Sequence, residues 1–422
     1  MIIMHIDANS AYLSWTAADM LENGYDIDIR NIPSAIAGDP DNRHGIILTK
    51  STPAKRYGIK TGESLLEARR KCPDLKVFPP DYDLYMRCSN AMYDILCRYS
   101  PAIQRYSVDE CFLDYTRSTL KFGDPVKAAY EIKEAVKEEL GFTVNIGVST
   151  NKLLAKMASE LKKPDMVHTI FPCEIEKKMW PLDISELFMV GRATAGKLKA
   201  VNINTIGDLA NADRALIKAL LKSHGELVWE YANGMDGSPV VLNEAIVQKG
   251  VGNSITVPYD VLDMKEAREV LLALSERVGM RLRAIRCISS LVSLHLRTSE
   301  LWGYGHQVQL QRYTDSTSDI YDIACGLLEE CWKGESLRQI GVSVSHLSGN
   351  ADRQLTIFDR EGLEKEERLN KTVDAIRREF GERVIERAVF ANTETDPIQG
   401  GVNDGNYLMM GGYKNEDLGA SH

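Results

Sequence analysis

Carboxylate side chains at two separated places in the chain could together hold divalent cations. Asp109 and Glu110 lie between two apolar runs of strand composition, and Asp7 closes the apolar run that begins the sequence. If the two strands are neighbours, three acids converge, which is unfavourable unless a cation neutralises them. Carboxylate oxygens suit Mg²⁺, and two such ions roughly 3.5–4 Å apart can clamp the attacking and leaving oxygens of a phosphoryl displacement. The sequence therefore predicts metal-assisted phosphoryl transfer.

Each of these acids needs a backbone element that positions it. Neighbouring side chains on a strand point to opposite faces, so the Asp-Glu pair can act together only if the chain turns near Ser107. The run before Asp7 predicts a central strand buried on both faces, and a helix over 10–22 follows it, with Asn9 or Ser10 as its N-cap. Two simpler interpretations stay open: a solvated hairpin tip for the pair, and a helix cap for Asp7.

Apolar periodicity predicts one α+β unit over residues 1 to about 170. Acids at the ends of antiparallel central strands fit a palm-like sheet. The predicted elements are strands at 2–6, 45–49 and 143–149, a hairpin at 103–115, and helices at 63–71, 83–99, 124–139 and 151–161. Ser149 or Thr150 is the expected N-cap of the last helix.

The rest of the chain predicts two further units. Short helices are expected over 171–235, and a linker with glycine and proline follows at 236–249. The region 250–350 shows the order β-α-β-β-α-β, an internally duplicated α+β layer. Its strands are expected near 251–257, 288–297, 306–312 and 338–346, and its helices near 264–284 and 317–332.

Two strings together resemble a known family: Asp7-Ala8-Asn9-Ser10-Ala11-Tyr12 and Ser107-Val108-Asp109-Glu110. They are similar to the Y-family DNA polymerases, the DinB/UmuC (impB/mucB/samB) translesion type, over about the first 358 residues. The resemblance implies a multidomain α+β right-hand polymerase with an antiparallel-rich palm sheet and small fingers. Its parts would be the palm at 1–170 with fingers inserted at about 24–80, the thumb at 171–235 and the little finger at 250–350.

The resemblance also implies the chemistry. Asp7, Asp109 and Glu110 would hold two Mg²⁺ ions, with Mn²⁺ as a substitute and the Ala8 carbonyl as a further ligand. The substrates would be primer–template DNA and a dNTP. A small fingers segment, and the lack of a stretch resembling a proofreading exonuclease, imply an open and error-prone site that bypasses lesions.

Residues in three segments would contact the nucleotide. Tyr12 would be the steric gate that excludes a 2′-hydroxyl, although a structural aromatic is the commoner role of such a residue. Ser51, Thr52 and Lys55 belong to a segment similar to the fingers loop that holds the triphosphate, and Lys163 would also reach the triphosphate. The family often has Tyr and Arg where this chain has Thr52 and Lys55, a departure that resembles the UmuC branch.

Polar residues in the later domains would contact DNA. A helix-hairpin-helix in the thumb can offer backbone amides to a phosphate, and a polar sheet face in the little finger can lie along the DNA backbone. A plain helical packing unit and a solvated sheet face are the competing interpretations. The expected contacts are Gly191, Thr194, Lys197, Arg281, Arg283, Ser289, Ser293 and Arg297.

The stretch after the little finger resembles the peptide by which bacterial proteins bind the sliding clamp. Leu355 and Phe358 would fill an apolar pocket, with Gln354 and Ile357 beside them. A final strand of the preceding sheet is the alternative. Residues 359–422 predict an acidic helix over about 361–387 and a flexible tail, where a further replication or damage-response partner could bind.

Composition limits the remaining choices. The net charge is −9, and residues 359–422 alone hold 14 acidic and nine basic residues, so local basic clusters must supply the DNA contacts. The eight cysteines show no metal or disulfide spacing, and no signal or membrane-spanning run is present, which predicts a cytoplasmic protein without a membrane partner.

Two other functions compete with the polymerase. A nucleotidyl cyclase uses similar carboxylates on a related sheet, but it explains neither the helix-hairpin-helix nor the clamp peptide. A non-catalytic, clamp-tethered DNA-binding protein would have no use for the three acids.

Overall fold

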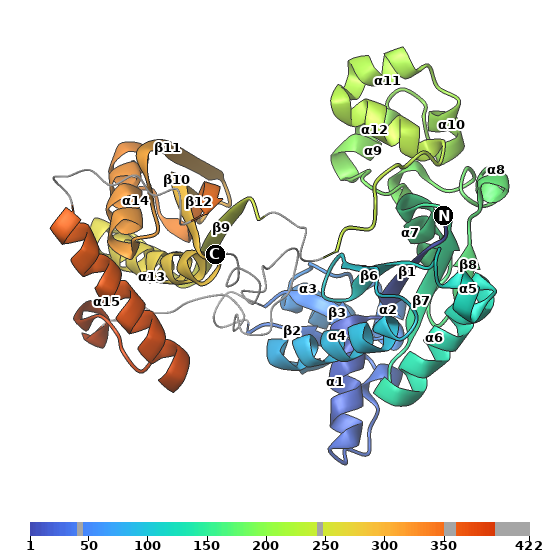
Figure 1. The fold of residues 1–422 in the computed structure, drawn as a ribbon, viewed down its shortest axis with the longest axis horizontal. Coiled ribbons are helices and arrows are strands. Elements are labelled where there is room, and N and C mark those ends of the chain that lie inside the picture. Colours follow the sequence, from blue (N-terminus) through green and yellow to red (C-terminus); the bar gives the residue numbers. More distant parts are fainter. Residues whose placement is uncertain (40–44, 243–247, 350–359, 393–422) are drawn as a thin grey trace, which may run out of the picture. The chain divides into compact units, whose positions relative to one another are not determined.

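The computed structural model describes residues 1–39, 45–242, 248–349 and 360–392 (Figure 1). They fall into two compact units, one of residues 1–37 and 47–246 and one composed chiefly of residues from 247 onward. The boundary lies inside the predicted linker 236–249. Within the described ranges, none of the helices combines the length and the apolar character needed to cross a membrane.

A five-stranded sheet in the order β5-β6-β1-β7-β8 forms the centre of the first unit. All its pairs are antiparallel except β7–β8. β1 and β7 are buried at every residue, which confirms the prediction that the first apolar run is a central strand. The strands are β1 (Ile3–Ala8), β5 (Ile103–Arg105), β6 (Glu110–Asp114), β7 (Val144–Ser149) and β8 (Val167–Thr169).

Five helices pack around this sheet, and their ends follow from local capping. The Asp81 side chain accepts from the Leu84 amide at the start of α4, and Asp124 followed by Pro125 begins α6. α7 lies close to β7 because Gly147 has no side chain; a Cβ there would come within 1.9 Å of the Ala155 carbonyl oxygen. The helices are α1 (Ala11–Glu22), α4 (Tyr82–Cys97), α5 (Thr119–Phe122), α6 (Pro125–Leu140) and α7 (Lys152–Glu160).

Of the two predicted N-caps, that of α1 is confirmed in position and that of α7 is wrong. Ser10 stands at the cap position of α1, but it has a positive φ of 50° and its side chain makes no capping hydrogen bond. Asn151 caps α7 by accepting from the Leu154 amide, so neither Ser149 nor Thr150 has that role. The Ser149 hydroxyl instead donates to the Ile170 carbonyl.

The segment predicted as fingers contains a small three-stranded sheet in the order β3-β2-β4. Of these strands, the sequence predicts only β3, at 45–49. The short apolar runs at the other two gave too little pattern for a prediction. The elements are β2 (Ser34–Ala37), β3 (Ile47–Lys50) and β4 (Lys76–Phe78), with the helices α2 (Thr52–Arg56) and α3 (Leu65–Lys71) and the short η1 (Ile29–Asn31).

Residues 171–235 are helical, as predicted, and share a core of buried aliphatic residues that includes Leu198, Ile206 and Val228. The helices are η2 (Pro172–Glu174), α8 (Ile175–Lys178), η3 (Ile184–Glu186), α9 (Arg192–Lys199), α10 (Ile206–Ala210), α11 (Arg214–Leu221) and α12 (Ser223–Ala232).

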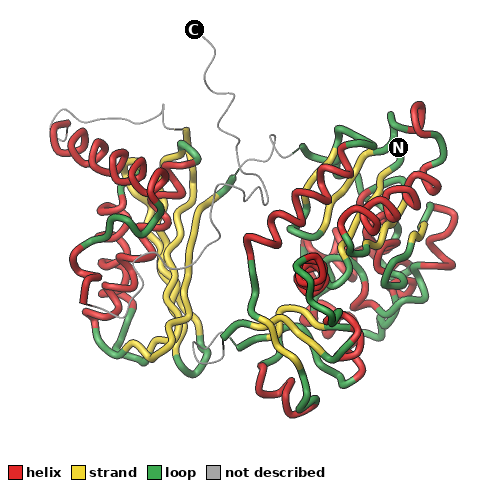
Figure 2. The backbone as a smooth tube through the Cα atoms, turned by 90° about the horizontal axis from the view of Figure 1, so that it is seen from below, coloured by secondary structure: helices red, strands yellow, loops and turns green. Residues whose placement is uncertain are grey.

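The second unit confirms the predicted order β-α-β-β-α-β. Its four antiparallel strands lie in the order β11-β10-β12-β9, and Figure 2 shows the helices gathered on one face of them. Leu271, Leu274 and Leu282 of α13 are fully buried in the core between the layers. The elements are β9 (Gly250–Val261), α13 (Met264–Ala284), β10 (Cys287–Thr298), β11 (Gly303–Thr314), α14 (Thr317–Cys331) and β12 (Leu337–Gly349).

A further helix, α15 (Arg360–Phe380), is joined to α13 by ion pairs, and the short η6 (Ala388–Asn392) follows it. Asp374 makes a two-pronged pair with Arg283 at 2.6 and 2.9 Å, and Arg377 donates to Glu276 at 2.7 Å. The helix that the sequence predicts over 361–387 ends earlier than expected, at Phe380.

Candidate active site

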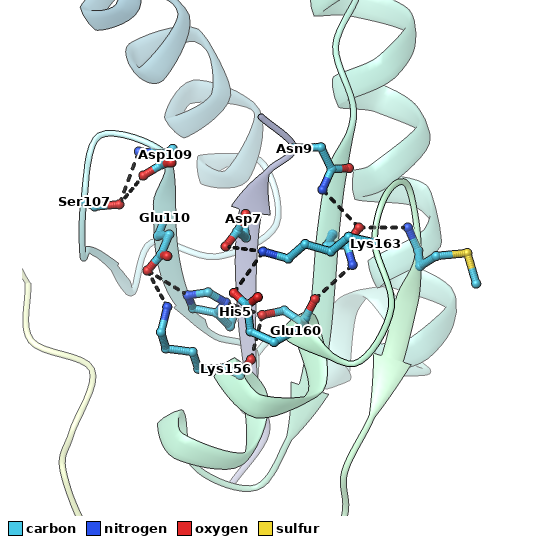
Figure 3. A network of polar contacts seen from close by, with 12 residues as sticks. His5, Asp7, Asn9, Ser107, Asp109, Glu110, Lys156, Glu160 and Lys163 are labelled. Carbon is cyan, nitrogen blue, oxygen red and sulfur yellow. Dashed lines mark hydrogen bonds and ion pairs between the residues drawn. The ribbon is translucent and has the colours of Figure 1, made fainter. Parts of the chain in front are cut away.

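The pairing of β1 with β6 brings two of the predicted acids face to face. Asp7 is the register partner of Glu110, and Asp7 is only 6% exposed. Each of Asp7, Glu110 and Glu160 has a carboxylate oxygen within 4.8 Å of the others, so these three form an acid cluster (Figure 3). Glu160 is contributed by the C-terminal end of α7.

Asp109 lies beside this cluster, on the loop that precedes β6. Its backbone carbonyl accepts from the Ala8 amide at 2.9 Å, which ties the loop to the end of β1. Its carboxylate accepts from the Ser107 hydroxyl at 2.5 Å and is not one of the three grouped carboxylates. Burial raises the pKa of Asp109, and the bond from Ser107 opposes that rise. The structure therefore brings the three predicted acids to one sheet edge but groups only two of their carboxylates.

Two lysines, Lys156 of α7 and the predicted Lys163, neutralise the cluster. Lys163 Nζ lies 3.1 Å from Asp7 Oδ2 and 2.9 Å from Glu160 Oε1. Lys156 Nζ lies 2.7 Å from Glu110 Oε2. Lys152 of the same helix donates to the Gln104 side chain at 3.1 Å. The ammonium groups of Lys156 and Lys163 thus offset the negative charge of the buried carboxylates.

The two facing acids have opposite electrostatic surroundings. Burial raises the pKa of Asp7 to about 7, against the attraction of Lys163. Burial would also raise the pKa of Glu110, but hydrogen bonding from His5 and Lys156 and the positive charge of Lys156 outweigh it and lower that pKa to about 2. Glu110 is therefore the firmly ionised member of the pair.

His5 supports Glu110 from inside the sheet. It is fully buried, with Nδ1 2.8 Å from the Ser159 hydroxyl and Nε2 3.4 Å from Glu110 Oε2. Burial lowers the pKa of His5 to about 4, so the imidazole is neutral at physiological pH. A neutral ring beside a carboxylate orients it without adding charge.

The donors at this sheet edge fit a hard divalent cation. The grouped atoms are carboxylate oxygens, the ligands that Mg²⁺ and Mn²⁺ prefer, and softer cysteine or histidine ligands are not among them. The side chain of Glu160 is half-exposed, so one side of the cluster is accessible from solvent. A substrate could approach from that side and complete the coordination of a bound cation.

Among the predicted nucleotide residues, Tyr12 lies on the first turn of α1, half-buried, and its ring contacts Tyr85 and Tyr82 of α4. Thr52 and Lys55 are exposed on α2. Ser51 does not fit its predicted role: its side chain is 1% exposed, caps α2 through the Ala54 amide, and donates to the Ile32 carbonyl. Ser51 shapes the loop and has no hydroxyl hydrogen left for a phosphate.

In the thumb, the predicted DNA contacts lie on or next to α9. Gly191 is the exposed N-cap of the helix, Lys197 is exposed, and Thr194 is partly exposed.

One predicted little-finger contact, Ser289, is wrong, and a second, Arg283, is engaged within the protein. Ser289 is fully buried, and its hydroxyl donates to the Ser345 carbonyl of the neighbouring strand β12. Arg283 is occupied by its ion pair with Asp374 of α15.

The other three predicted contacts of this unit remain accessible. Arg297 is exposed on β10, and Ser293 and Arg281 are partly exposed. The predicted clamp residues Gln354, Leu355, Ile357 and Phe358 and most of the tail lie outside the described residues.

Sequence reasoning missed Glu160. Its signal was its position three residues before Lys163, a spacing at which helical side chains are neighbours. That spacing alone gave no reason to connect it with Asp7, which is distant in the chain.

The fold and the site define a template-directed nucleotidyltransferase of the palm type, and comparisons with known proteins specify it. The impB/mucB/samB family model matches residues 6–160, and the model of that family's C-terminal domain matches residues 248–357. The chain belongs to this family, the Y-family DNA polymerases, and it is a DNA-directed DNA polymerase of the translesion type.

Curated relatives named DNA polymerase IV share most of its length. The protein of Clostridium acetobutylicum is 47% identical over 93% of this chain and 99% of its own. That of Acetivibrio thermocellus is 37% identical over 92% of this chain and 97% of its own. These names agree with the DinB type; the closer likeness to the UmuC branch, expected from Thr52 and Lys55, stays a prediction.

Solved structures share the fold. A Y-family DNA polymerase chimera, Dbh-Dpo4(243-245)-Dbh, matches with a TM-score of 0.72 and 22% identity, over 83% of this chain and all of that chain. An insertion ternary complex of Dbh DNA polymerase matches with a TM-score of 0.58 and 21% identity, over 83% of this chain and all of that chain.

Proposed function

We propose that this polymerase transfers a nucleotide from a dNTP to a primer 3′-hydroxyl at the edge of the β1–β6 sheet. Asp7, Asp109 and Glu110, with the Ala8 carbonyl, would hold two Mg²⁺ ions, and Mn²⁺ would substitute. When bound, such ions lower the pKa of the attacking hydroxyl and neutralise the leaving pyrophosphate. The cytoplasm is the proposed location, since all eight cysteines are free thiols.

The chain's own side chains supply the rest of the reaction. Lys163, now 3.1 Å from Asp7, has a flexible stem that can reach a triphosphate placed over the acid cluster. Lys55 adds a second positive charge from α2, where its exposed side chain can approach the same phosphates. Tyr12 would lie under the sugar and exclude a ribose. Glu110 stays ionised because Lys156 and His5 hold its carboxylate.

The observation that carries this proposal is the facing pair Asp7 and Glu110 at the end of a central strand, with the Asp109 loop bonded to that strand end. A pure DNA-binding protein gains nothing from a buried carboxylate cluster, which costs stability unless it is paired. The pair therefore favours catalysis over the non-enzymatic alternative.

Primer extension tests the proposal. Asp7→Asn and Glu110→Gln should reduce insertion by at least about 10³-fold on both undamaged and abasic templates, while primer–template binding stays within twofold. Asp183→Asn, which changes an exposed carboxylate of the thumb, is the matched control and should insert normally. Retained insertion in Asp7→Asn would contradict the proposed site, and formation of a cyclic nucleotide from a triphosphate would favour a cyclase.

The proposed partners follow from the same family membership. Primer–template DNA would run along the exposed residues of α9 and β10, and a bacterial sliding clamp would bind the 354–358 peptide. The small three-stranded fingers sheet, in the order β3-β2-β4, supports the proposal of error-prone insertion opposite lesions.

A further inference from the structure

A buried pair of amide side chains, Asn9 and Asn145, lies behind the acid cluster. Asn145 is fully buried on β7, where it is the register partner of Asp7. Asn9 is 6% exposed, and its Nδ2 donates to Asn145 Oδ1 at 3.1 Å (Figure 3). None of the hydrogen bonds that these two side chains make in the described structure goes to the grouped carboxylates, so the site described above does not explain them.

Asn145 uses its full hydrogen-bonding capacity. Its Nδ2 donates to the backbone carbonyls of Ser159 at 2.9 Å and Lys162 at 2.7 Å. Its Oδ1 accepts from Asn9 and from the Met166 amide, the latter at 3.3 Å. Two donor hydrogens and two acceptor lone pairs are all that an amide offers. Because both Nδ2 partners are carbonyl oxygens, the orientation of the amide is determined.

The two carbonyls that Asn145 holds belong to the residues directly before Glu160 and Lys163. A peptide unit is planar and rigid, so fixing its carbonyl fixes the direction in which the next residue leaves. Glu160 and Lys163 form an ion pair at 2.9 Å, and Lys163 reaches Asp7 from there. One buried side chain thus sets the place of both charged partners.

Lys163 lies on the loop that follows α7, and Asn9 fixes this loop on the C-terminal side of Lys163. Its Oδ1 accepts from the Asp165 amide at 2.8 Å and from the Thr143 hydroxyl at 2.9 Å. The Asp165 carboxylate is in turn held by Lys133 and Lys137, each at 2.8 Å. The loop that carries Lys163 is therefore fixed on both sides of that residue.

We propose that Asn145, together with Asn9, is a positioning residue for nucleotide binding, which fixes Lys163 so that its ammonium group meets the dNTP triphosphate. This inference rests on the role proposed above for Lys163. Without the Asn145 amide, the Ser159 carbonyl, the Met166 amide and the Asn9 amide lose this partner, and the Lys162 carbonyl keeps only its contact with His168 Nε2 at 3.2 Å. The loop then shifts to satisfy these groups. The shift weakens dNTP binding and leaves primer–template binding unchanged.

Equilibrium binding of a dNTP to the full-length enzyme on a dideoxy-terminated primer–template measures this effect without chemistry. Asn145→Leu keeps the volume and removes all four hydrogen bonds, so the dNTP Kd should rise roughly tenfold, or about 1.4 kcal/mol. Asn145→Asp keeps the acceptor oxygen but cannot donate to either carbonyl, and it should weaken dNTP binding to a similar extent. In insertion assays, KM should rise more than kcat falls.

The matched control is Asn151→Ala at the opposite end of α7. Asn151 caps the helix through the Leu154 amide and donates to the Gly234 carbonyl, so its loss destabilises the same helix without touching the Lys163 loop. The dNTP Kd of this variant should stay at the wild-type value. Asn9→Ala, which leaves both carbonyl contacts of Asn145 in place, should give an intermediate rise and serves if Asn145→Leu does not fold.

Lys163→Ala separates the two proposals. If Asn145 acts through Lys163, the double variant binds dNTP no more weakly than Lys163→Ala alone. An unchanged Kd in Lys163→Ala would refute the role of the lysine. Weaker dNTP binding by Lys163→Ala would uphold that role. The positioning role of Asn145 would then be overturned by any of three results: fully additive effects in the double variant, an unchanged dNTP Kd in Asn145→Leu, or an equal loss of dNTP binding in Asn151→Ala.

Discussion

The ring of Tyr12 stacks on the ring of Tyr85, with centroids 4.3 Å apart and an interplanar angle of 9°. The two residues come from α1 and α4, and Tyr82 meets Tyr12 edge-on at 6.4 Å. Aromatic pairs of this kind contribute about 0.5–1.5 kcal/mol beyond the area that they bury. The stack therefore fixes the position of the Tyr12 ring. A ring that excludes a 2′-hydroxyl by its bulk has to be fixed in this way.

Tyr12→Ala should raise insertion of ribonucleotides relative to deoxyribonucleotides by roughly tenfold or more, because the ring that would meet the 2′-hydroxyl is removed. Tyr12→Phe keeps the ring and should keep the discrimination. Single-nucleotide insertion with matched dNTP and rNTP measures both. Equal sugar discrimination in Tyr12→Ala and the wild type would rule out the steric-gate assignment.

Lys55 gives a second test of the nucleotide site. A lysine offers a point charge where an arginine offers a two-pronged fork, so Lys55→Arg should lower the KM for dNTP and Lys55→Ala should raise it about tenfold. Steady-state insertion kinetics measure the change. Lys218→Ala, at an exposed lysine of α11, is the control and should leave KM unchanged. A KM unaffected by Lys55→Ala would exclude Lys55 from the phosphate site.

The contact between α13 and α15 should depend on pH. Burial would raise the pKa of Glu276, but hydrogen bonds from Arg377 and Arg387 outweigh it, so the pKa of the folded state is lowered. The stabilisation is then present above the unfolded pKa of roughly 4.3 and is lost as pH falls through the folded value. Thermal unfolding between pH 3 and pH 7, at about half-unit steps, should show this loss for the second unit.

Glu276→Gln should remove that part of the pH dependence. At pH 7 it should cost somewhat less than the roughly 3–5 kcal/mol of a broken buried pair, because the Arg387 side chain is partly exposed. Glu329→Gln, which breaks an exposed pair with Arg268, is the matched control and should leave the acid transition in place. An identical acid transition in Glu276→Gln would show that this contact does not control it.

Deleting residues 354–358 should abolish stimulation of synthesis by a bacterial sliding clamp, because the peptide would lose the two apolar side chains that fill the pocket. Basal insertion without clamp should stay unchanged, since the deletion lies outside the palm. Primer extension on a long template with and without clamp measures both. Full stimulation of the deletion variant would move the clamp contact elsewhere.

Most of the fold was predictable because its elements follow strong local periodicity. The strand and helix bounds of 250–350 agree with the sequence to within a few residues, since apolar residues alternate on the strands and recur every three to four residues on the helices. The errors occur where a distant contact decides. The hydroxyl of the buried Ser289 is bonded to Ser345, and Arg283 forms an ion pair with Asp374, which lies 91 residues away in the chain.

The acid pair was predictable for a different reason. Asp7 lies near the end of β1 and Glu110 at the start of β6, and the antiparallel pairing of these two strands places them together. Glu160 was not predictable, because its carboxylate reaches the cluster only when α7 lies directly on β7. That approach depends on the absent side chain of Gly147. The amide pair behind the cluster was missed as well, because neither Asn9 nor Asn145 has a local pattern that reveals its distant partners.

The antiparallel register of β1 has one more consequence. Asp7 is opposite Glu110 on one neighbour and opposite Asn145 on the other. A slip of either neighbour by a single residue would turn its side chain to the reverse face of the sheet. A palm with misaligned strands could be compact and yet inactive. The rate at which insertion activity recovers during refolding would therefore report the final alignment of β1, β6 and β7 rather than the collapse of the chain.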